Sequence, residues 1–426
     1  MTLSYTSTLE LHPQVTMAEF NSRPENKSYR VELTDGRHFQ INETLFRLLV
    51  VLRTPTSLEK LLSTFCGSGE HSIPSAEITA ISTELVAQGI LVQDGVVPPN
   101  TTKRQEDASL LALHFRREIF SAERLAPIVR PFQWFFTRPV AAILMSLVVA
   151  VHVMLYLQVG FAAQADMSGV NWPLFLLVLL VSIFVHEFGH LAACQRWNCP
   201  HGPLGIGFYF FQPVFYVDVT AAWRLNRWQR AVVDLAGIYL QLIGTIFFWL
   251  LWLATQDKTW LFAIFMTDMF AYSNLQPFMK LDGYWLLSDL SGVPNLHARV
   301  GAVLGYWVQR LMVLVGFGKP ATTPSPLAGW SASTRRTVLV YLAVALLVWP
   351  LMLIQMIPML LQVVLSTPAL WPAALSSLPS ALLQGDFKTV LTSLQTLFLP
   401  LLMGMNLFVI GRQLARKAFK GQRMAQ

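Results

Sequence analysis

The chain has 426 residues, of which 54% are hydrophobic and only 13% are charged, whereas soluble proteins carry roughly 25% charged residues. This balance argues against a soluble protein and indicates a membrane protein. The net charge of +7 does not indicate a nucleic-acid partner, because Lys and Arg lie mostly beside apolar segments, where they control membrane topology.

Residues 1–100 have the composition of a soluble domain. Their first residues carry no signal-peptide pattern, so we expect this domain in the cytoplasm. Residues 28–33 and 38–42 predict two strands joined by a hairpin turn. Helical periodicity then predicts three helices, the second capped by Thr56 or Ser57, and a short closing strand. Together these elements indicate an α+β domain of the winged-helix type.

Residues 101–137 are polar, then basic and aromatic, and predict a linker that ends on the membrane surface. Beyond it, residues 138–411 form a predicted membrane domain with six apolar segments, each near the roughly 20 residues that a span needs. The predicted spans are 139–159, 172–194, 233–255, 259–279, 337–361 and 389–411. Alternate connecting segments are rich in Lys and Arg, and residues 412–426 form a basic tail that can anchor at the cytoplasmic leaflet. We expect a multi-pass protein of the plasma or inner membrane with both termini in the cytoplasm.

Residues 205–219 are apolar without predicting a span, because they are rich in aromatic and β-branched residues and contain Pro213. We expect a membrane-associated β-hairpin whose edges are covered by protein or face a cavity. The predicted fold is therefore a polytopic α-helical membrane protein with about six spans, this β-hairpin and the N-terminal α+β domain.

The second predicted span contains the sequence HEFGH, from His186 to His190. Two histidines four positions apart share one face of a helix and can bind the same metal ion. Glu187 lies beside them, where it can accept a proton from a water molecule that zinc activates. HExxH also occurs by chance in soluble helices, but ionisable groups inside a span are costly unless they are paired or functional. The pattern therefore indicates a catalytic Zn²⁺ site, which needs a third protein ligand.

The third ligand cannot be a downstream glutamate, because the chain has none after position 187. The remaining candidates are Asp218, Asp234, Asp257, Asp268, Asp282, Asp289, Asp386, His201 and His297. His186 should lie about 21 Å from the outer face, at 1.5 Å per helical residue. Asp257 and Asp386 are then on the wrong side, and Asp268 is about 7 Å too shallow. Asp282, at the cytoplasmic end of the fourth predicted span, matches this depth best.

The segment around this aspartate reads NLQPFMKLDGYW, from position 274 to 285. Pro277 should end the helix there and free backbone groups to line a cavity. Gly283 should let the chain turn beside the ligand. Asn274 can offer its amide to a substrate carbonyl or to the oxyanion that develops from it.

HExxH in one span and N-x-x-P-x-x-x-L-D-G in a later one resemble the site-2 protease family of intramembrane zinc metalloproteases. The resemblance covers residues 139–290. It implies that His186, His190 and Asp282 hold zinc, that Glu187 is the general base and that Asn274 positions the substrate.

Two further segments, FFQPVFYVDVTAAWRLNRWQR and LAGIYLQL, are similar to the branch of this family named "putative peptide zinc metalloproteases". The chain departs from the family at Gly237-Ile238, where many members have Gly-Pro, and we interpret this as a mark of the branch. Residues 29–52, YRVELTDGRHFQINETLFRLLVVL, resemble the PqqD-like fold, which grips leader peptides of ribosomally made, modified peptides. That resemblance implies that a peptide adds to the edge of the small sheet. The alternative is a plain winged helix with a regulatory or packing role.

We therefore expect a zinc endopeptidase that cleaves a peptide bond within or at the cytoplasmic edge of the bilayer, in a leader-bearing precursor peptide. The substrate would contact Pro277 and Gly283 and, as a strand added to the hairpin, Phe211 and Tyr216. One alternative is regulated proteolysis of a membrane-anchored signalling protein. Another is a non-catalytic peptide export or immunity protein that keeps the metal site. The sequence does not determine the oligomeric state.

Three other groups of polar residues fit less direct roles. His152 is expected to be a hydrogen-bonded packing residue, and Asp268 to support the structure or a ligand. Cys194, Cys199 and His201 have loose spacing and lack a fourth partner for a second zinc site.

Overall fold

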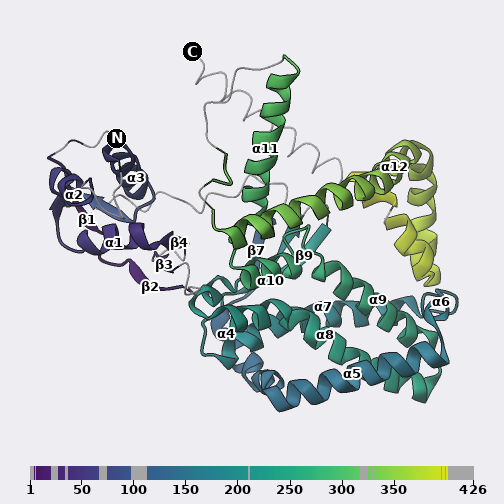
Figure 1. Cartoon of the computed structure of the whole chain (residues 1–426). Coiled ribbons are helices and arrows are strands. Elements are labelled where there is room, and N and C mark those ends of the chain that lie inside the picture. The colour runs from purple at the N-terminus through teal and green to yellow at the C-terminus, as the bar shows by residue number, and fades with distance from the viewer. Residues whose placement is uncertain are drawn as a thin grey trace. The chain divides into compact units, whose positions relative to one another are not determined.

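The computed structural model describes residues 4–401 with several gaps, and Figure 1 labels its elements. The residues not described within this range are 5, 21–26, 34–36, 67–73, 97–112, 210–211, 317–324, 329, 395 and 399. The chain divides into two compact units, each described here by itself. One comprises Met1–Asp107 with Trp223–Arg227, and the other comprises Ala108–Ala222 with Trp228–Gln426.

The first unit contains two antiparallel three-stranded sheets with the strand orders β5-β1-β6 and β2-β3-β4. Their strands are β1 (Thr8–Leu11), β2 (Thr16–Glu19), β3 (Ser28–Glu32), β4 (His38–Asn42), β5 (Thr56–Ser57) and β6 (Leu91–Gln93). The predicted strand pair is confirmed, since β3 and β4 pair from Ser28↔Asn42 to Glu32↔His38. Strands β1, β2 and β5 were not predicted. β1 pairs only with segments distant in sequence, and local periodicity does not reveal such pairing.

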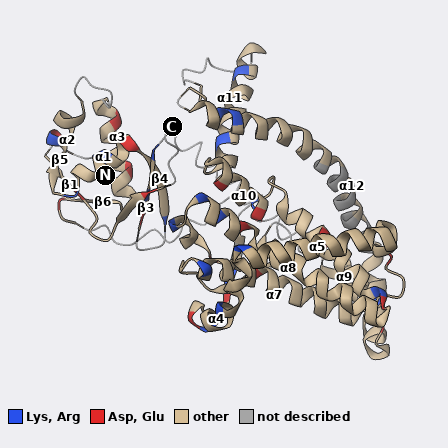
Figure 2. Cartoon of the chain, turned by 60° about the horizontal axis from the view of Figure 1, so that its bottom comes forward, with Lys and Arg blue, Asp and Glu red and all other residues tan. Residues whose placement is uncertain are grey.

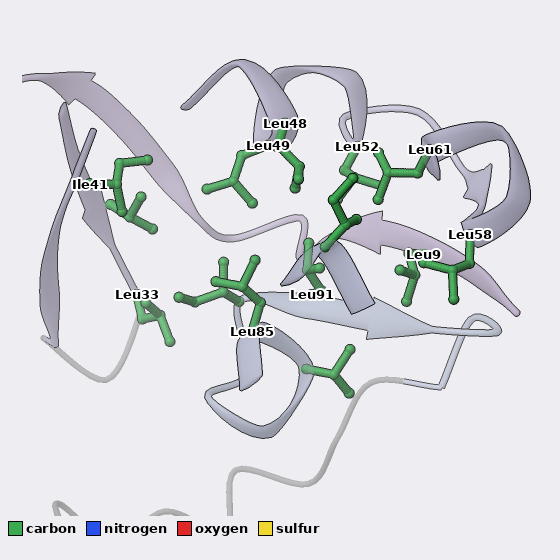
Figure 3. Close-up of a cluster of buried hydrophobic side chains, with 14 residues drawn as sticks. Leu9, Leu33, Ile41, Leu48, Leu49, Leu52, Leu58, Leu61, Leu85 and Leu91 are labelled. Atoms are coloured by element: carbon green, nitrogen blue, oxygen red, sulfur yellow. The ribbon is translucent and has the colours of Figure 1, made fainter. Parts of the chain in front are cut away.

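The three helices predicted in this unit are confirmed as α1 (Glu43–Val51), α2 (Leu58–Phe65) and α3 (Ser75–Ala87). The Ser57 side chain accepts a hydrogen bond from the backbone N–H of Lys60 at 3.3 Å, which identifies it as the N-cap of α2. The apolar faces of the helices meet the strands in a cluster of 14 buried side chains, most of them leucines (Figure 3). The winged-helix assignment and the PqqD likeness stay predictions.

The second unit is mainly helical. Its helices are α4 (Ala122–Val129), α5 (Arg138–Gln158), α6 (Phe161–Gln164), α7 (Trp172–Arg196), α8 (Arg227–Thr255), α9 (Lys258–Leu275), α10 (Asp282–Ser291), α11 (Leu296–Leu314) and α12 (Ala332–Gln384), with 3-10 turns η1 (Arg130–Phe136) and η2 (Thr220–Arg224). Within the described chain, four helices are long and apolar enough to cross a membrane: α5, α7, α8 and the part of α12 from Ala332 to Leu351. Figure 2 shows few charged residues along the helices α5, α7, α8 and α9.

The predicted number of six spans is therefore not confirmed. The fourth corresponds to α9, which has 18 residues and is not one of the four helices above. α9 ends at Leu275 because Gln276, before Pro277, takes an extended conformation, so the predicted helix break is confirmed. The fifth extends further than predicted: residues 362–384, expected in a connecting segment, belong to α12. Part of the sixth, residues 402–411, lies outside the described residues.

The predicted β-hairpin is confirmed as β8 (Leu204–Tyr209) and β9 (Gln212–Val217), and a third strand extends it. This strand, β7 (Leu113–Phe120), comes from the segment expected to be a linker and pairs antiparallel with β8. The resulting order is β7-β8-β9, so β9 is an edge strand among the described residues. The ring of Phe215 on β9 packs against Phe184 on α7, with centroids 4.6 Å apart, which places the sheet beside the HExxH helix.

Candidate metal centre

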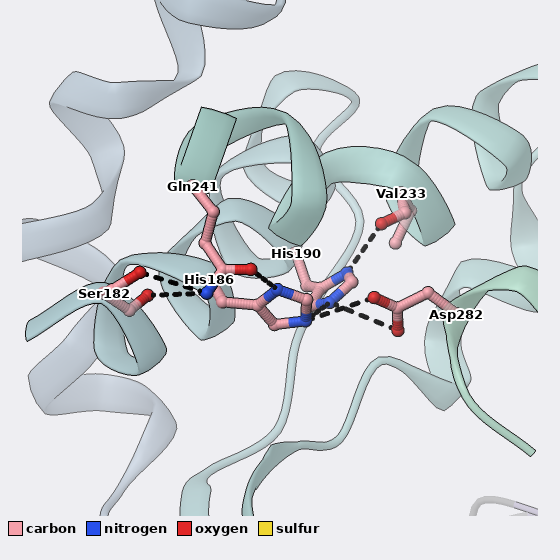
Figure 4. A network of polar contacts seen from close by, with 6 residues as sticks. All are labelled: Ser182, His186, His190, Val233, Gln241 and Asp282. Atoms are coloured by element: carbon pink, nitrogen blue, oxygen red, sulfur yellow. Dashed lines mark hydrogen bonds and ion pairs between the residues drawn. The ribbon is translucent and has the colours of Figure 1, made fainter. Parts of the chain in front are cut away.

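Three side chains converge in the interior of the second unit: His186 and His190 from α7 and Asp282 from the start of α10 (Figure 4). One possible ligand atom from each residue lies within 4.8 Å of the others, and this is the one such group among the described residues. The helical spacing places both imidazoles on one face of α7. The structure thus brings together the three residues that the sequence assigned to a metal.

The hydrogen bonds of the two imidazoles determine where their protons lie. His190 Nδ1 is 2.7 Å from the carbonyl oxygen of Val233, which can only accept. His186 Nδ1 is 2.9 Å from Oε1 of Gln241, whose Nε2 donates to the carbonyl and hydroxyl oxygens of Ser182 at 3.3 and 3.2 Å. Both Nδ1 atoms must therefore donate, and in the neutral rings both Nε2 atoms carry lone pairs.

These lone pairs face one another and a carboxylate. The two Nε2 atoms are 3.1 Å apart, and they lie 3.1 Å (His186) and 3.6 Å (His190) from the carboxylate oxygens of Asp282. Oδ2 of Asp282 is buried and makes no hydrogen bond within the described chain. Three electron-pair donors this close repel one another unless a cation lies among them. Two imidazoles and a carboxylate are a donor set that zinc accepts, so the residues fit the expected metal.

Two glycines permit this arrangement. A Cβ at Gly237 of α8 would lie 2.6 Å from Cε1 and Nε2 of His186 and 2.6 Å from Nε2 of His190, so any side chain there would fill the space between the ligands. A Cβ at Gly189 of α7 would overlap the carbonyl group of Ala236, which shows how closely α7 and α8 approach. The pair Gly237-Ile238 thus keeps the glycine that this arrangement of ligands requires.

Glu187 is buried next to the ligands, with 8% of its surface exposed. Strand β9 lies beside the same helix, since the ring of Phe215 packs against that of Phe184 on α7. The general base expected from the sequence is therefore adjacent to the ligands along α7, the helix against which the edge strand β9 packs.

The other predicted site residues lie on the surrounding elements. Asn274 is half-buried in the last turn of α9, and Pro277 follows in the connection to Asp282. Gly283 has an ordinary φ angle and not a turn conformation; a Cβ there would overlap the backbone of Leu275, so this glycine allows close packing. Tyr216 lies on β9, where its ring covers Gly205 of β8. Phe211 lies outside the described residues.

The structure also places three other residues that were candidates for the third ligand. Asp268 pairs with His152 of α5, with Nε2 and Oδ1 3.0 Å apart, and Asp289 pairs with the buried Arg230 at 2.8 Å. His201 contacts the carbonyl oxygen of its neighbour Gly202 at 3.0 Å.

Sequence reasoning missed the partners of the ligands. Gln241, the carbonyl of Val233 and Ser182 orient the imidazoles, and such partners commonly tune metal binding. A signal existed for Gln241, because it is an amide inside an apolar span and has to be hydrogen-bonded there. Nothing in the sequence marks a backbone carbonyl such as that of Val233.

The chain is 26% identical over 157 residues to a Bacillus subtilis (strain 168) protein named "Putative peptide zinc metalloprotease protein YydH". The match covers 34% of this chain and 58% of that protein, so the chain spans less than two thirds of the relative's length. No protein-family model matches the chain, and no solved structure does. This distant likeness suggests a zinc metalloprotease, and the cluster of two histidines and an aspartate could bind the metal.

Proposed function

We propose that the chain is a zinc endopeptidase that hydrolyses a peptide bond within or at the cytoplasmic edge of a membrane. The observation that carries the proposal is the convergence of three possible ligand atoms, on His186, His190 and Asp282, inside a unit with membrane-length helices. Glu187, which a purely structural metal site would not need, lies beside them. The named relative supports the same chemistry.

His186, His190 and Asp282 would hold the ion. When bound, zinc supplies a Lewis acid that activates water and polarises a carbonyl group. Glu187 accepts the proton of the attacking water and passes it to the leaving amine. Asn274 donates its amide N–H to the substrate carbonyl and stabilises the charge that develops there. The buried surroundings strengthen these interactions because they exclude bulk water.

The edge of β9 supports binding of the substrate as an added strand. Asp218 exchanges backbone hydrogen bonds with Gly202 and Pro203, at 2.7 and 3.4 Å. Hydrogen-bonding direction alternates along an antiparallel strand, so the peptide groups of Phe215 and Val217 face away from β8. Strand β9 packs on the helix that carries Glu187, through the contact of Phe215 with Phe184. A peptide that pairs with this edge would pass next to the general base.

The substrate we propose is a leader-bearing precursor peptide that the first unit recognises. Its small antiparallel sheets offer edge strands for an extended peptide, and the relative's name refers to a peptide protease. The following experiment separates this function from two alternatives. These are cleavage of a membrane-anchored signalling protein and a non-catalytic role in export.

The test uses Glu187→Gln, which keeps the shape of the side chain but removes the base. We expect one zinc per chain in both proteins, and cleavage slower by about 100- to 10,000-fold in the variant. Peptides retained by purified Glu187→Gln are identified by mass spectrometry and then offered to the wild type. Glu123→Gln, an exposed change on α4, is the matched control. Wild-type cleavage or peptide export in Glu187→Gln would contradict the protease assignment.

A further inference from the structure

The short connection between α9 and α10, residues 276–281, carries Asp282 into the metal centre. Helix α9 ends and helix α10 begins at this connection, so its peptide groups are outside the regular helical hydrogen-bond pattern. Inside a membrane unit these groups need partners from the protein. Two tyrosines that are far apart in sequence provide such partners.

Tyr341 of α12 holds the connection from one side. Its hydroxyl donates to the carbonyl oxygen of Pro277 at 2.9 Å. The same hydroxyl oxygen lies 2.8 Å from Nε2 of His297, at the start of α11. Because a tyrosine has one hydroxyl proton and it points to Pro277, the imidazole must be the donor in this second bond. His297 therefore fixes the direction in which Tyr341 donates.

The surroundings make this pair rigid. Tyr341 is 5% exposed and lies in an apolar cluster with Phe278 of the connection and Tyr284 of α10. The rings of Tyr284 and His297 are 4.4 Å apart. Tyr284 is itself 1% exposed and follows Asp282 in the first turn of α10. A hydrogen bond buried in this way is costly to lose, because its groups cannot turn to water.

Tyr209 of β8 holds the connection at a second point. Its hydroxyl oxygen accepts a hydrogen bond from the backbone N–H of Lys280 at 2.8 Å. The peptide groups of Pro277 and Lys280 are thus each held by a side chain from another element. The backbone that leads into Asp282 is consequently restrained from α12 and from the sheet.

We propose that Tyr341, oriented by His297, is a positioning residue that holds the Asp282 carboxylate in place for metal binding. This inference rests on the proposed role of Asp282 as a ligand. It gives α12 a function in the site: its first turns restrain the loop that supplies the third ligand.

The test measures metal binding in the purified full-length protein, with Zn²⁺ and Co²⁺ as the probes. Tyr341→Phe keeps the ring in its apolar cluster and removes only the hydroxyl. We expect its Zn²⁺ dissociation constant, measured by competition with a chelator, to rise about ten-fold, near the lower limit for loss of an outer partner. The visible absorption spectrum of the Co²⁺-loaded protein should change as well, because it reports the geometry of the ligands. Tyr156→Phe, an exposed change on α5, should leave both measurements as in the wild type.

His297 supplies a second test that does not depend on Tyr341→Phe folding. His297→Gln can keep a donor for Tyr341 and should retain more Zn²⁺ affinity than His297→Leu. A Tyr341→Phe protein with lowered thermal stability but wild-type Zn²⁺ affinity and Co²⁺ spectrum would overturn the positioning role. Equal affinities in the two His297 variants would overturn it too. If Asp282→Ala binds Zn²⁺ as tightly as the wild type, the ligand assignment itself fails, and that failure is distinguishable from the others.

Discussion

The two units of this chain both bury apolar side chains, but among the described residues the second unit also buries ionisable ones. The first unit encloses an apolar cluster built mostly from leucines, such as Leu48 and Leu91. The second unit has apolar side chains on its outer surface, while its interior holds His186, Glu187 and His190. The apolar exterior suits a lipid environment, in which polar groups need partners inside the protein.

This difference predicts which substitutions each unit tolerates. A leucine cluster is stabilised by buried area, which several similar side chains can supply. The polar interior depends on donor atoms at given positions, and a change of one atom removes a partner that no neighbour replaces. Substitutions should therefore lower stability in the first unit and metal affinity in the second.

The largest expected effect comes from Gly237→Ala. Its new Cβ would lie 2.6 Å from Nε2 of both His186 and His190, so we expect Zn²⁺ affinity to fall by about 100-fold or more. Gly244→Ala on the same helix is the matched control, because the nearest atom to its Cβ is 4.0 Å away. Metal analysis of the purified proteins checks this. Wild-type zinc content in Gly237→Ala would contradict the geometry of the site.

Leu48→Ala should show the opposite behaviour. Leu48 is fully buried in the leucine cluster, so its truncation should lower the free energy of unfolding of the first unit by about 2 to 5 kcal/mol. Amide hydrogen exchange in residues 8–93 measures this, and Val50→Ala on the same helix, 40% exposed, is the control. The Zn²⁺ affinity should stay unchanged. A loss of zinc in Leu48→Ala would break the contrast between the units.

Gln241→Leu tests the polar interior without touching a ligand. It leaves the Nδ1–H of His186 and the carbonyl of Ser182 without their partner, so we expect Zn²⁺ affinity to fall by about 10- to 100-fold. Gln158→Leu, an exposed change at the end of α5, should have no effect. Chelator competition measures both. Equal affinities would show that the His186 tautomer needs no outside support.

Arg47→Ala should have the smallest effect. Arg47 pairs with Glu43 one turn earlier on the surface of α1, at 2.7 Å. Exposed pairs of this kind contribute about 0.3 to 0.5 kcal/mol, which salt weakens further. The midpoint temperature of thermal unfolding should be nearly the same for the variant and the wild type, at low salt and at high salt. A change as large as that of Leu48→Ala would mean that the surface of the first unit matters as much as its core.

Local patterns predicted those parts of the fold that depend on neighbours along the chain. The four-residue spacing of His186 and His190, the helix break before Pro277 and the hairpin at β8 and β9 are of this kind. Strand β7 was missed because its sequence, LHFRREIF, is charged and aromatic, and it becomes a strand by pairing with β8, far along the chain. The length of α12 was also missed: residues 362–384 were expected to connect two spans, whereas they continue the helix, and apolar helices can tolerate proline.

The candidate site divides in the same way. His186, Glu187 and His190 follow from one helical turn, and Asp282 followed from its expected depth, which matched that of His186 best. The groups that complete the site, Gly237 and the partners of the imidazoles, depend on how α8 packs against α7. That packing is set by shape complementarity between helices, which a single sequence does not display.

The central claim is that two imidazoles and one carboxylate hold a single zinc ion in the second unit. X-ray absorption at the zinc edge of the purified full-length protein tests it most directly. We predict one zinc per chain with nitrogen and oxygen neighbours alone, and loss of this signal in Asp282→Ala. Sulfur neighbours, which would implicate Cys194 and Cys199, or an unchanged spectrum in Asp282→Ala, would contradict the account.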